Sequence, residues 1–210
     1  MDHNPSQQSL FSESGIQKID FPRFEGEIHR SAFSDSEGAE LLTLLLSEID
    51  WSQEQIKMFG EFINVPRLTA WHGDTDKPYT YSGITMTPTP WTDTLLIIKK
   101  RAEYLAGTSF NSVLLNQYRD GNDGVSWHAD DEPELGETPT IGSVSLGVSR
   151  KFQLRRKGES RSATSIDLIS GDVLIMRGKT QKYWEHQVPK SKAQKSMGVR
   201  VNLTFRTIVS

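Results

Sequence analysis

Hydrophobic and polar positions divide this chain into a helical part and a strand-rich part. Near residue 34 the spacing of Ser34 and Glu37 is that of a capping box, which predicts a helix start. The positions that follow recur every three or four residues, as on one face of a helix. This apolar stripe consists of Leu41, Leu42, Leu44, Leu45 and Ile49.

A second helix is predicted over residues 92–105. Thr92 is a suitable N-cap and Gly107 a suitable end, because glycine adopts the left-handed conformation that often closes a helix. The pattern predicts that much of its buried side is formed by Leu95, Leu96, Ile98 and Tyr104.

From residue 112 onward the pattern changes to short β-type runs separated by glycine, aspartate, proline or lysine-rich turns. These runs cover residues 113–119, 140–148, 151–156, 164–169, 172–177 and 199–209. Two helices followed by at least six strands predict an α+β fold with a sheet sandwich or barrel as its core.

The remaining segments are less regular. Residues 1–20 are polar, and we expect them to form a mobile N-terminal arm. Residues 51–90 are rich in aromatic residues, glycine, proline and threonine, and four prolines interrupt any long element. At 210 residues the chain is most simply one domain, which we expect over residues 21–210.

Composition narrows the chemistry. The chain has no cysteine, which excludes disulfides, thiolate zinc sites and iron–sulfur clusters. It shows no secretory signal and no apolar run of the ~18 residues that a membrane span requires. We therefore expect a cytoplasmic protein without membrane contact.

Charge is segregated along the chain. Residues 1–50 hold 3 basic and 10 acidic side chains, whereas residues 139–210 hold 14 basic and 4 acidic ones. A basic face that binds a polyanion is therefore compatible with the net charge of −3. Basic stretches at 150–157, at Arg161 and at 190–195 could follow phosphates, or could be ordinary solvated side chains.

A candidate metal site begins at residues 128–130. His128 and Asp130 would share one face of an extended strand, because side chains alternate. Alone this pair is a weak motif, but His186 is the only other histidine in the strand-rich half. Two imidazoles and one carboxylate form a facial triad, which suits iron(II) and leaves three coordination positions open.

The last strand offers a candidate anion site. Along residues 200–206 the even positions are polar and the odd positions apolar, so one face presents Arg200, Asn202, Thr204 and Arg206. The two arginines could hold a short dicarboxylate from both ends, because guanidinium and carboxylate pair in a bidentate way. A solvated outer face is the alternative. Asn116 and Tyr118 share one face of an earlier strand and could donate to the same anion.

Together these residues resemble the AlkB family of iron(II)- and 2-oxoglutarate-dependent dioxygenases, over roughly residues 55–209. The resemblance rests on Asn116-x-Tyr118, the run 128–132, His186 and the run 200–206. It implies a double-stranded β-helix, or jelly-roll, core over 112–209, a nucleotide-recognition lid over 55–90, and O2 as the oxidant. It also implies iron(II) on His128, Asp130 and His186, and 2-oxoglutarate on Asn116, Tyr118, Arg200, Asn202, Thr204 and Arg206.

The resemblance further implies oxidative demethylation of N-alkylated bases such as 1-methyladenine and 3-methylcytosine, with release of formaldehyde. The lid segment resembles that of the family's duplex-DNA-acting branch, so single- or double-stranded DNA is the expected partner. RNA, protein or a small molecule are alternative substrates, and simple nucleic-acid binding is a rival function. A monomer is expected, located at the nucleoid when it acts on DNA, or in the nucleus of a eukaryote. A methylated Watson–Crick edge is reachable only when the base is extruded from a duplex. The implied substrate-binding residues are Phe59, Gly60, Arg67, Tyr79, Tyr81, Ser82, Asp131 and Glu132.

Several of these assignments have alternatives. Phe59 is either a wedge that fills the space of the flipped base or an ordinary core residue. Asp131 is expected to bridge the iron and the flipped base. Glu185, next to His186, lies either near the iron or on the outer face, and Glu61 stands where a basic residue would help to hold phosphate.

Overall fold

The computed structural model describes residues 15–58, 60–75, 79–81, 84–86, 88–191 and 198–209. For residues 56–58, 79–81 and 84–86 it describes the backbone alone. No helix in these described ranges is long and apolar enough to cross a membrane.

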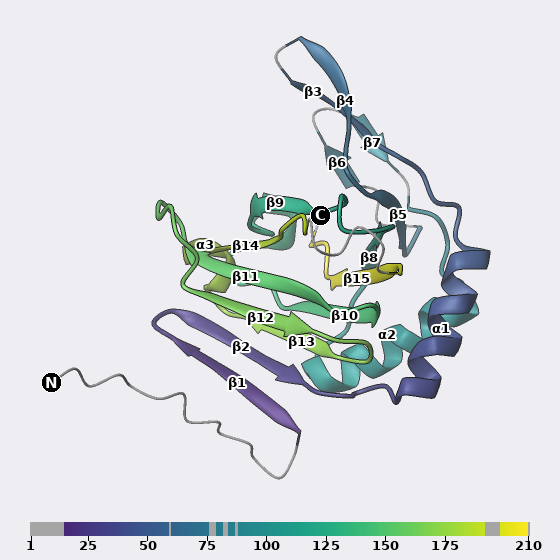
Figure 1. Cartoon of the computed structure of the whole chain (residues 1–210), viewed down its shortest axis with the longest axis horizontal. Coiled ribbons are helices and arrows are strands. Elements are labelled where there is room, and N and C mark those ends of the chain that lie inside the picture. The colour runs from purple at the N-terminus through teal and green to yellow at the C-terminus, as the bar shows by residue number, and fades with distance from the viewer. Residues whose placement is uncertain are drawn as a thin grey trace, which may run out of the picture.

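Two antiparallel sheets form the body of the molecule (Figure 1). The larger sheet has the strand order β1-β2-β13-β10-β15-β8-β5 and the smaller one β12-β11-β14-β9. The larger sheet is built from β1 (Ile16–Phe21), β2 (Phe24–His29), β5 (Leu68–Gly73), β8 (Ser112–Tyr118), β10 (Ile141–Gly147), β13 (Val173–Arg177) and β15 (Arg200–Arg206). The smaller sheet is built from β9 (Val125–His128), β11 (Arg150–Arg156), β12 (Thr164–Leu168) and β14 (Trp184–Val188). This α+β arrangement is consistent with the jelly-roll core that we expected.

Two long helices pack on one face of the larger sheet. Helix α1 (Asp35–Glu48) has Ser34 as its N-cap and shows the predicted capping box. Helix α2 (Asp93–Ala106) has Thr92 as its N-cap and Gly107, in the left-handed conformation, as its C-cap. Their buried side chains form one core with alternate residues of the sheet, including Val201, Leu203 and Phe205 of β15. Short helical turns follow at Pro133–Leu135 (η1) and Thr180–Tyr183 (α3).

The buried side of α2 differs in part from the prediction. Leu95 and Ile98 are fully buried, but Leu96 is exposed and Tyr104 is 83% exposed. A helix that lies on one sheet buries a single narrow stripe, so side chains a quarter turn away remain in solvent.

A second core lies between the two sheets. Ile28, Leu174 and Met176 from the larger sheet are buried with side chains of the smaller sheet. The partners from the smaller sheet are Phe152, Leu154, Leu168, Trp184 and Val188. The helices cover the opposite face of the larger sheet. A site on this sheet can therefore form only on the inner face, beside the second core.

Three predicted boundaries need correction. The arm expected over 1–20 is shorter, because residues 16–21 pair with β2 and bury Ile19; residues 1–14 lie outside the described part. The core expected over 112–209 also recruits β1, β2 and β5. The lid expected over 55–90 is regular where it is described. It contains hairpin β3–β4 (Gln55–Met58 and Glu61–Asn64) and hairpin β6–β7 (Tyr79–Tyr81 and Ile84–Met86), and it supplies β5 to the sheet.

Candidate metal and 2-oxoglutarate site

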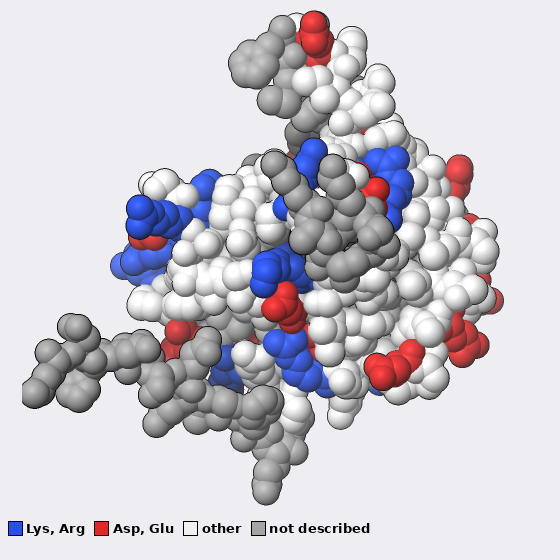
Figure 2. Space-filling view, in the orientation of Figure 1, with Lys and Arg blue, Asp and Glu red and all other residues white. Residues whose placement is uncertain are grey.

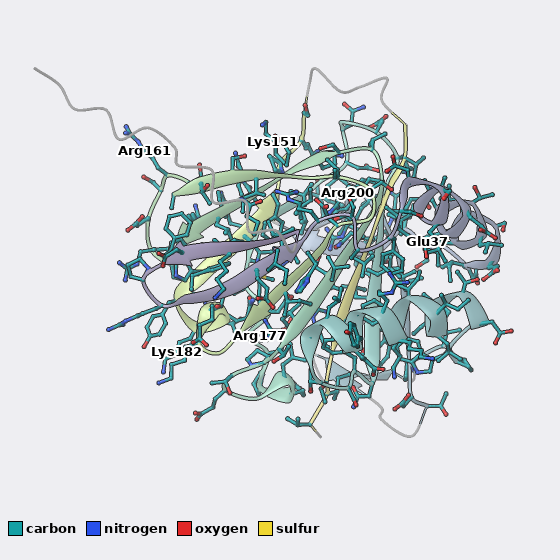
Figure 3. All side chains as sticks on the ribbon, turned by 90° about the horizontal axis from the view of Figure 1, so that it is seen from below. Glu37, Lys151, Arg161, Arg177, Lys182 and Arg200 are labelled. Atoms are coloured by element: carbon teal, nitrogen blue, oxygen red, sulfur yellow. The ribbon has the colours of Figure 1, made fainter. Side chains whose placement is uncertain are left out.

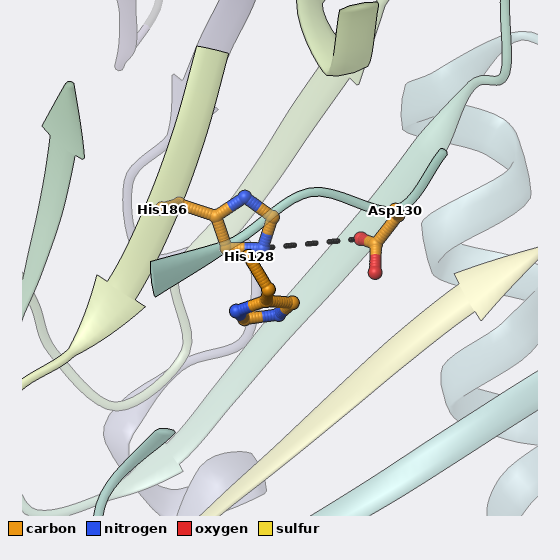
Figure 4. Close-up of side chains that lie close together, drawn as sticks. All are labelled: His128, Asp130 and His186. Atoms are coloured by element: carbon orange, nitrogen blue, oxygen red, sulfur yellow. Dashed lines mark ion pairs between the residues drawn. The ribbon is translucent and has the colours of Figure 1, made fainter. Parts of the chain in front are cut away.

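His128, Asp130 and His186 converge between the sheets, as Figure 4 shows. Their candidate ligand atoms all lie within 4.8 Å of one another, and His186 Nε2 is 3.9 Å from Asp130 Oδ2. His128 and His186 are cross-strand partners on β9 and β14, with ring centroids 4.3 Å apart. The strand pairing therefore brings together two ligands that lie 58 positions apart in the sequence.

The strand prediction for these residues was partly wrong. β9 ends at His128, so Asp130 lies in the segment after the strand and not on its face. His186 lies within β14. Asp130 reaches the site because its backbone N–H donates to Gln181 Oε1 at 3.0 Å, which fixes the segment against α3.

Further hydrogen bonds orient the ligands. His128 Nδ1 lies 2.8 Å from the carbonyl oxygen of Ser126, to which it donates, and this leaves Nε2 as the free ligand atom. Arg206 Nη2 donates to Asp130 Oδ1 at 2.5 Å. Asp130 Oδ2 is buried without a hydrogen-bond partner among the described residues.

Electrostatics keep two of the ligands, Asp130 and His186, in the form that binds a metal. Burial raises the pKa of Asp130, but Arg206, His186 and His128 more than offset burial, so the pKa lies below its usual value. Burial, together with the nearby His128, lowers the pKa of His186 to about 3. A carboxylate and a neutral imidazole are the forms in which these groups coordinate metals.

These observations fit a divalent metal of the iron type. Two imidazoles and one carboxylate on one side of an ion make the facial triad and leave positions for other ligands. The unpaired, buried Asp130 Oδ2 is the kind of orphan atom that a metal would satisfy.

A cavity of about 420 Å³ opens on this site. Its size is typical of pockets for small molecules. It brings together all nine residues predicted for the metal and for 2-oxoglutarate, namely Asn116, Tyr118, His128, Asp130, His186, Arg200, Asn202, Thr204 and Arg206. Of the predicted substrate residues, Arg67 and Glu132 also line it.

Arg200 is the clearest anion-binding feature of the cavity. Its side chain is fully buried, and in Figure 3 it lies within the molecule. Nη2 donates to Ser145 Oγ at 2.9 Å, whereas Nε and Nη1 are buried without a partner among the described residues. No carboxylate in that part of the chain forms an ion pair with it. An unpaired buried cation is strongly unfavourable, so this site is shaped for an anionic ligand.

Tyr118 lies beside Arg200, whose Cζ is 5.3 Å from the centre of the phenol ring. Burial raises the pKa of Tyr118, although the surrounding Arg200, Arg67 and Arg150 oppose the shift. The phenol therefore remains protonated at neutral pH and can donate to the same anion.

The other predicted residues are held by the protein itself. Asn202 Nδ2 donates to Ser143 Oγ and to the carbonyl oxygen of Val144, and its Oδ1 accepts from Thr204. Asn116 Oδ1 accepts from Arg67 Nε at 2.7 Å. The even face of β15 is thus buried and not solvated.

The clamp of two arginines on a short dicarboxylate stays a prediction. Arg206 lines the cavity, and one of its Nη atoms donates to Asp130. Its Nε remains buried without a partner in the described ranges. Arg206 therefore stands at the metal end of the cavity, and Arg200 marks the far end.

Asp131 does not line the cavity, contrary to its expected role as a bridge between metal and base. Its carboxylate Oδ2 accepts from Lys157 Nζ at 2.6 Å and is largely exposed. Successive residues of an extended segment point in opposite directions, and here Asp130 and Glu132 point inward. Glu132 Oε2 is buried without a partner among the described residues, so Glu132 is the acidic group that faces the cavity.

The lid residues are described only in part. Phe59 and Ser82 lie outside the described residues, and Tyr79 and Tyr81 belong to β6 with only their backbone described. Gly60 forms the exposed turn of the β3–β4 hairpin with φ of 89°, and it does not line the cavity. The β3–β4 hairpin projects from the body in Figure 1.

Glu185 lies on the outer face of the smaller sheet. It is the cross-strand partner of Arg155 and accepts from Arg155 Nε at 2.8 Å. The guanidinium of Arg155 in turn lies 4.4 Å from the centre of the Trp127 ring. His186, one position on, faces the opposite way, so Glu185 is not an iron ligand.

Sequence reasoning missed three supporting groups: the Ser126 carbonyl, Gln181 and Ser145. Ser143 and Ser145 alternate with apolar residues in the β10 run, so their common face could have been recognised. No local pattern marks Gln181, because it reaches Asp130 from 51 positions away.

A family model described as the 2OG-Fe(II) oxygenase superfamily matches residues 27–206. The chain therefore belongs to the 2OG-Fe(II) oxygenase superfamily, whose name specifies iron(II) and 2-oxoglutarate. The family resemblance and the class of enzyme expected from the sequence are thereby confirmed.

Within that superfamily the chain is similar to AlkB homologues. It is 43% identical over 173 residues to alpha-ketoglutarate-dependent dioxygenase alkB homolog 3 of Bos taurus, across 78% of this chain and 59% of that protein. It is 37% identical to DNA oxidative demethylase ALKBH2 of Homo sapiens, across 84% of this chain and 71% of that protein. ALKBH2 of Arabidopsis thaliana is 31% identical across 99% of this chain and 78% of its own length.

A solved structure, that of OsALKBH1, has the same fold. The TM-score is 0.62 at 17% sequence identity, across 90% of this chain and 99% of that one. The chain spans about three fifths of the length of the alkB homolog 3 proteins that it matches.

Proposed function

We propose that this protein is an iron(II)- and 2-oxoglutarate-dependent dioxygenase that demethylates N-methylated bases, such as 1-methyladenine and 3-methylcytosine, in DNA. The products would be the repaired base, formaldehyde, succinate and CO2. The names of the ALKBH2 relatives, which specify DNA oxidative demethylation, support the substrate class.

One observation carries the proposal: a cavity with a metal-ligand triad at one end and an uncompensated buried arginine at the other. Arg200 has two buried nitrogen atoms without a partner in the described part of the chain, and Asp130 has one such oxygen. A small dianion that reaches from Arg200 to the metal would satisfy both ends. 2-Oxoglutarate has this shape, with a carboxylate at one end and a keto acid at the other.

The residues of the site have separate tasks. Arg200 and Tyr118 would hold the far carboxylate, Arg206 keeps Asp130 ionised and in position, and Ser126 fixes the tautomer of His128. When bound, iron(II) would supply the redox chemistry that divides dioxygen between 2-oxoglutarate, which becomes succinate and CO2, and the N-methyl group. The resulting N-hydroxymethyl cation then loses its hydroxyl proton as the C–N bond breaks, which releases formaldehyde and returns the electron pair to the ring nitrogen of the neutral base.

The substrate end of the cavity suits a methylated base. 1-Methyladenine and 3-methylcytosine carry a positive charge at neutral pH. The half-buried Glu132, whose Oε2 is buried without a partner among the described residues, would attract that charge. It would also accept a hydrogen bond from the exocyclic amine on the Watson–Crick edge, which is the edge that a flipped base presents. Arg67 lines the same cavity but is tied to Asn116, so it would form a fixed wall.

Formaldehyde release is the direct test. The full chain is incubated with iron(II), 2-oxoglutarate and matched 1-methyladenine oligonucleotides as single-stranded DNA, duplex DNA and RNA. We expect release from DNA that depends on iron, on 2-oxoglutarate and on the methyl group, with unmethylated strands as the control. Release from RNA alone would replace DNA by RNA as substrate, and 2-oxoglutarate binding without release from any strand would overturn the demethylase proposal.

A further inference from the structure

A second depression, of about 320 Å³, adjoins the metal site but is not part of its cavity. It lies between the segment after η1, the end of β11 and helix α3. Its lining consists of Asp131, Gly136, Glu137, Pro139, Lys157, Lys179, Gln181 and Lys182.

The depression and the metal site share a wall. Gln181 lines the depression, and its side-chain oxygen holds the backbone N–H of the metal ligand Asp130. Asp131 lines it as well, whereas its neighbours Asp130 and Glu132 line the catalytic cavity. A polynucleotide with one base in the cavity could therefore place its neighbouring nucleotides in this depression.

The depression has an excess of positive charge. Lys157 is paired with Asp131, but among the ion pairs of the described residues none includes Lys179 or Lys182. Both of these lysines are exposed, and Figure 3 shows Lys182 on the outside of the molecule. Figure 2 shows further basic side chains at the same end of the molecule, where the turn between β11 and β12 lies. Glu137 is the other acidic group in the lining, so the lysines outnumber the carboxylates.

We propose that Lys179 and Lys182 form a subsite for the backbone phosphates of the polynucleotide strand whose base enters the cavity; this inference rests on the proposed function. Lysine ammonium groups bind phosphate as point charges on flexible stems and need no fixed geometry. Such contacts position a strand without reading its sequence. The subsite would hold the strand beside the cavity and leave Glu132 to recognise the base.

Binding of unmethylated single-stranded DNA as a function of salt tests the subsite. Each phosphate that a lysine neutralises adds about 0.7 to the slope of log K against log salt for a single strand. K179A/K182A should therefore lower the slope by about 1.4. Between 50 and 200 mM salt the wild-type protein should then lose about sevenfold more affinity than the variant. Fluorescence anisotropy with a labelled oligonucleotide measures both proteins.

A matched control removes two exposed lysines elsewhere. Lys18 on β1 and Lys100 on α2 are both exposed and lie away from the depression. K18A/K100A has the same change in net charge, and its salt slope should equal that of the wild type. Equal slopes for all three proteins, or an equal decrease in both variants, would overturn the subsite.

Substrate length separates this inference from the proposed function. K179A/K182A should raise KM for a methylated 15-mer and leave kcat, and turnover of a methylated mononucleotide, unchanged. A 15-mer of RNA in parallel shows whether the subsite accepts either backbone. If the wild type releases no formaldehyde from any substrate, the proposed function fails, whereas the binding slopes still decide on the subsite.

Discussion

Replacement of Arg200 by methionine removes the charge that the cavity leaves uncompensated while it keeps most of the side-chain volume. In the wild type, Arg200 donates to Ser145 and has two buried nitrogen atoms without a partner in the described ranges. Burial lowers the pKa of its guanidinium, which reflects the unfavourable environment of the charge. We expect Arg200→Met to weaken binding of 2-oxoglutarate strongly without destabilising the ligand-free protein.

The expected loss of affinity follows from the burial of the ion pair that Arg200 would form with the carboxylate of 2-oxoglutarate. Loss of one partner of a buried, hydrogen-bonded charge pair costs about 2–5 kcal/mol, which corresponds to a loss of affinity of roughly 30- to 4000-fold. In the ligand-free protein the same substitution removes an unpaired buried charge, which is neutral or stabilising. The two effects have opposite directions, so they can be separated.

Thermal unfolding with and without 2-oxoglutarate measures both effects, with manganese(II) in place of iron(II) to prevent turnover. At 100 times its Kd the ligand should stabilise the wild type by about 2.7 kcal/mol, which raises Tm by roughly 5–11 °C in a chain of this size. Arg200→Met should lose this increase and should unfold at or above the Tm of the ligand-free wild type. Arg161→Met, at an exposed arginine after β11, is the matched control and should keep the increase. A full ligand-dependent increase in Arg200→Met would refute the assignment of the far carboxylate to Arg200.

Three further predictions concern the metal end and a nearby loop. His128→Ala should abolish formaldehyde release and leave the Tm of the metal-free protein unchanged within a few degrees; retained activity would remove His128 from the metal site. Glu185→Gln should change the iron(II) affinity less than about threefold, because Glu185 pairs with Arg155 on the outer face of the smaller sheet and faces away from the metal ligands; a larger loss in a metal titration would assign Glu185 to the iron. Burial raises the pKa of Asp123, but hydrogen bonds from Arg119 outweigh burial and lower it, so this carboxylate stabilises the fold above its unfolded pKa of about 3.8. Asp123→Asn should therefore reduce the free energy of unfolding at pH 7, and the difference should shrink as pH falls through the folded pKa; a difference that is constant down to pH 3 would contradict this pairing.

The sequence predicted the elements that local patterns define. The capping box of Ser34 and the Gly107 terminus fixed both long helices, because caps depend on residues three or four positions apart. The alternation along residues 200–206 predicted which side chains share a face, because strand geometry determines it. That face is buried because the smaller sheet packs over it. The pattern within residues 200–206 carries no information about this packing.

The metal ligands were predictable as residue types, whereas their geometry was not. The spacing of His128 and Asp130 suggested one strand face, yet the strand ends at His128 and a contact with Gln181 turns Asp130 inward. Side chains still alternate along this segment, so Asp130 and Glu132 line the cavity and Asp131 faces Lys157. The expectation for Asp131 was wrong because Asp131 belongs to the opposite face of the segment.

The base of the lid and the 2-oxoglutarate site form one hydrogen-bonded unit, and this limits how substrate and co-substrate can influence each other. Arg67 precedes β5 and donates to Asn116 on β8, while the carbonyl oxygen of Pro66 accepts from the backbone N–H of Gly124. β5 itself pairs with residues 112–117 of β8. A base that contacts Arg67 would therefore press on a side chain that is already fixed to the wall of the co-substrate site. Because that wall is part of the larger sheet, the two ligands should meet in a preformed cavity.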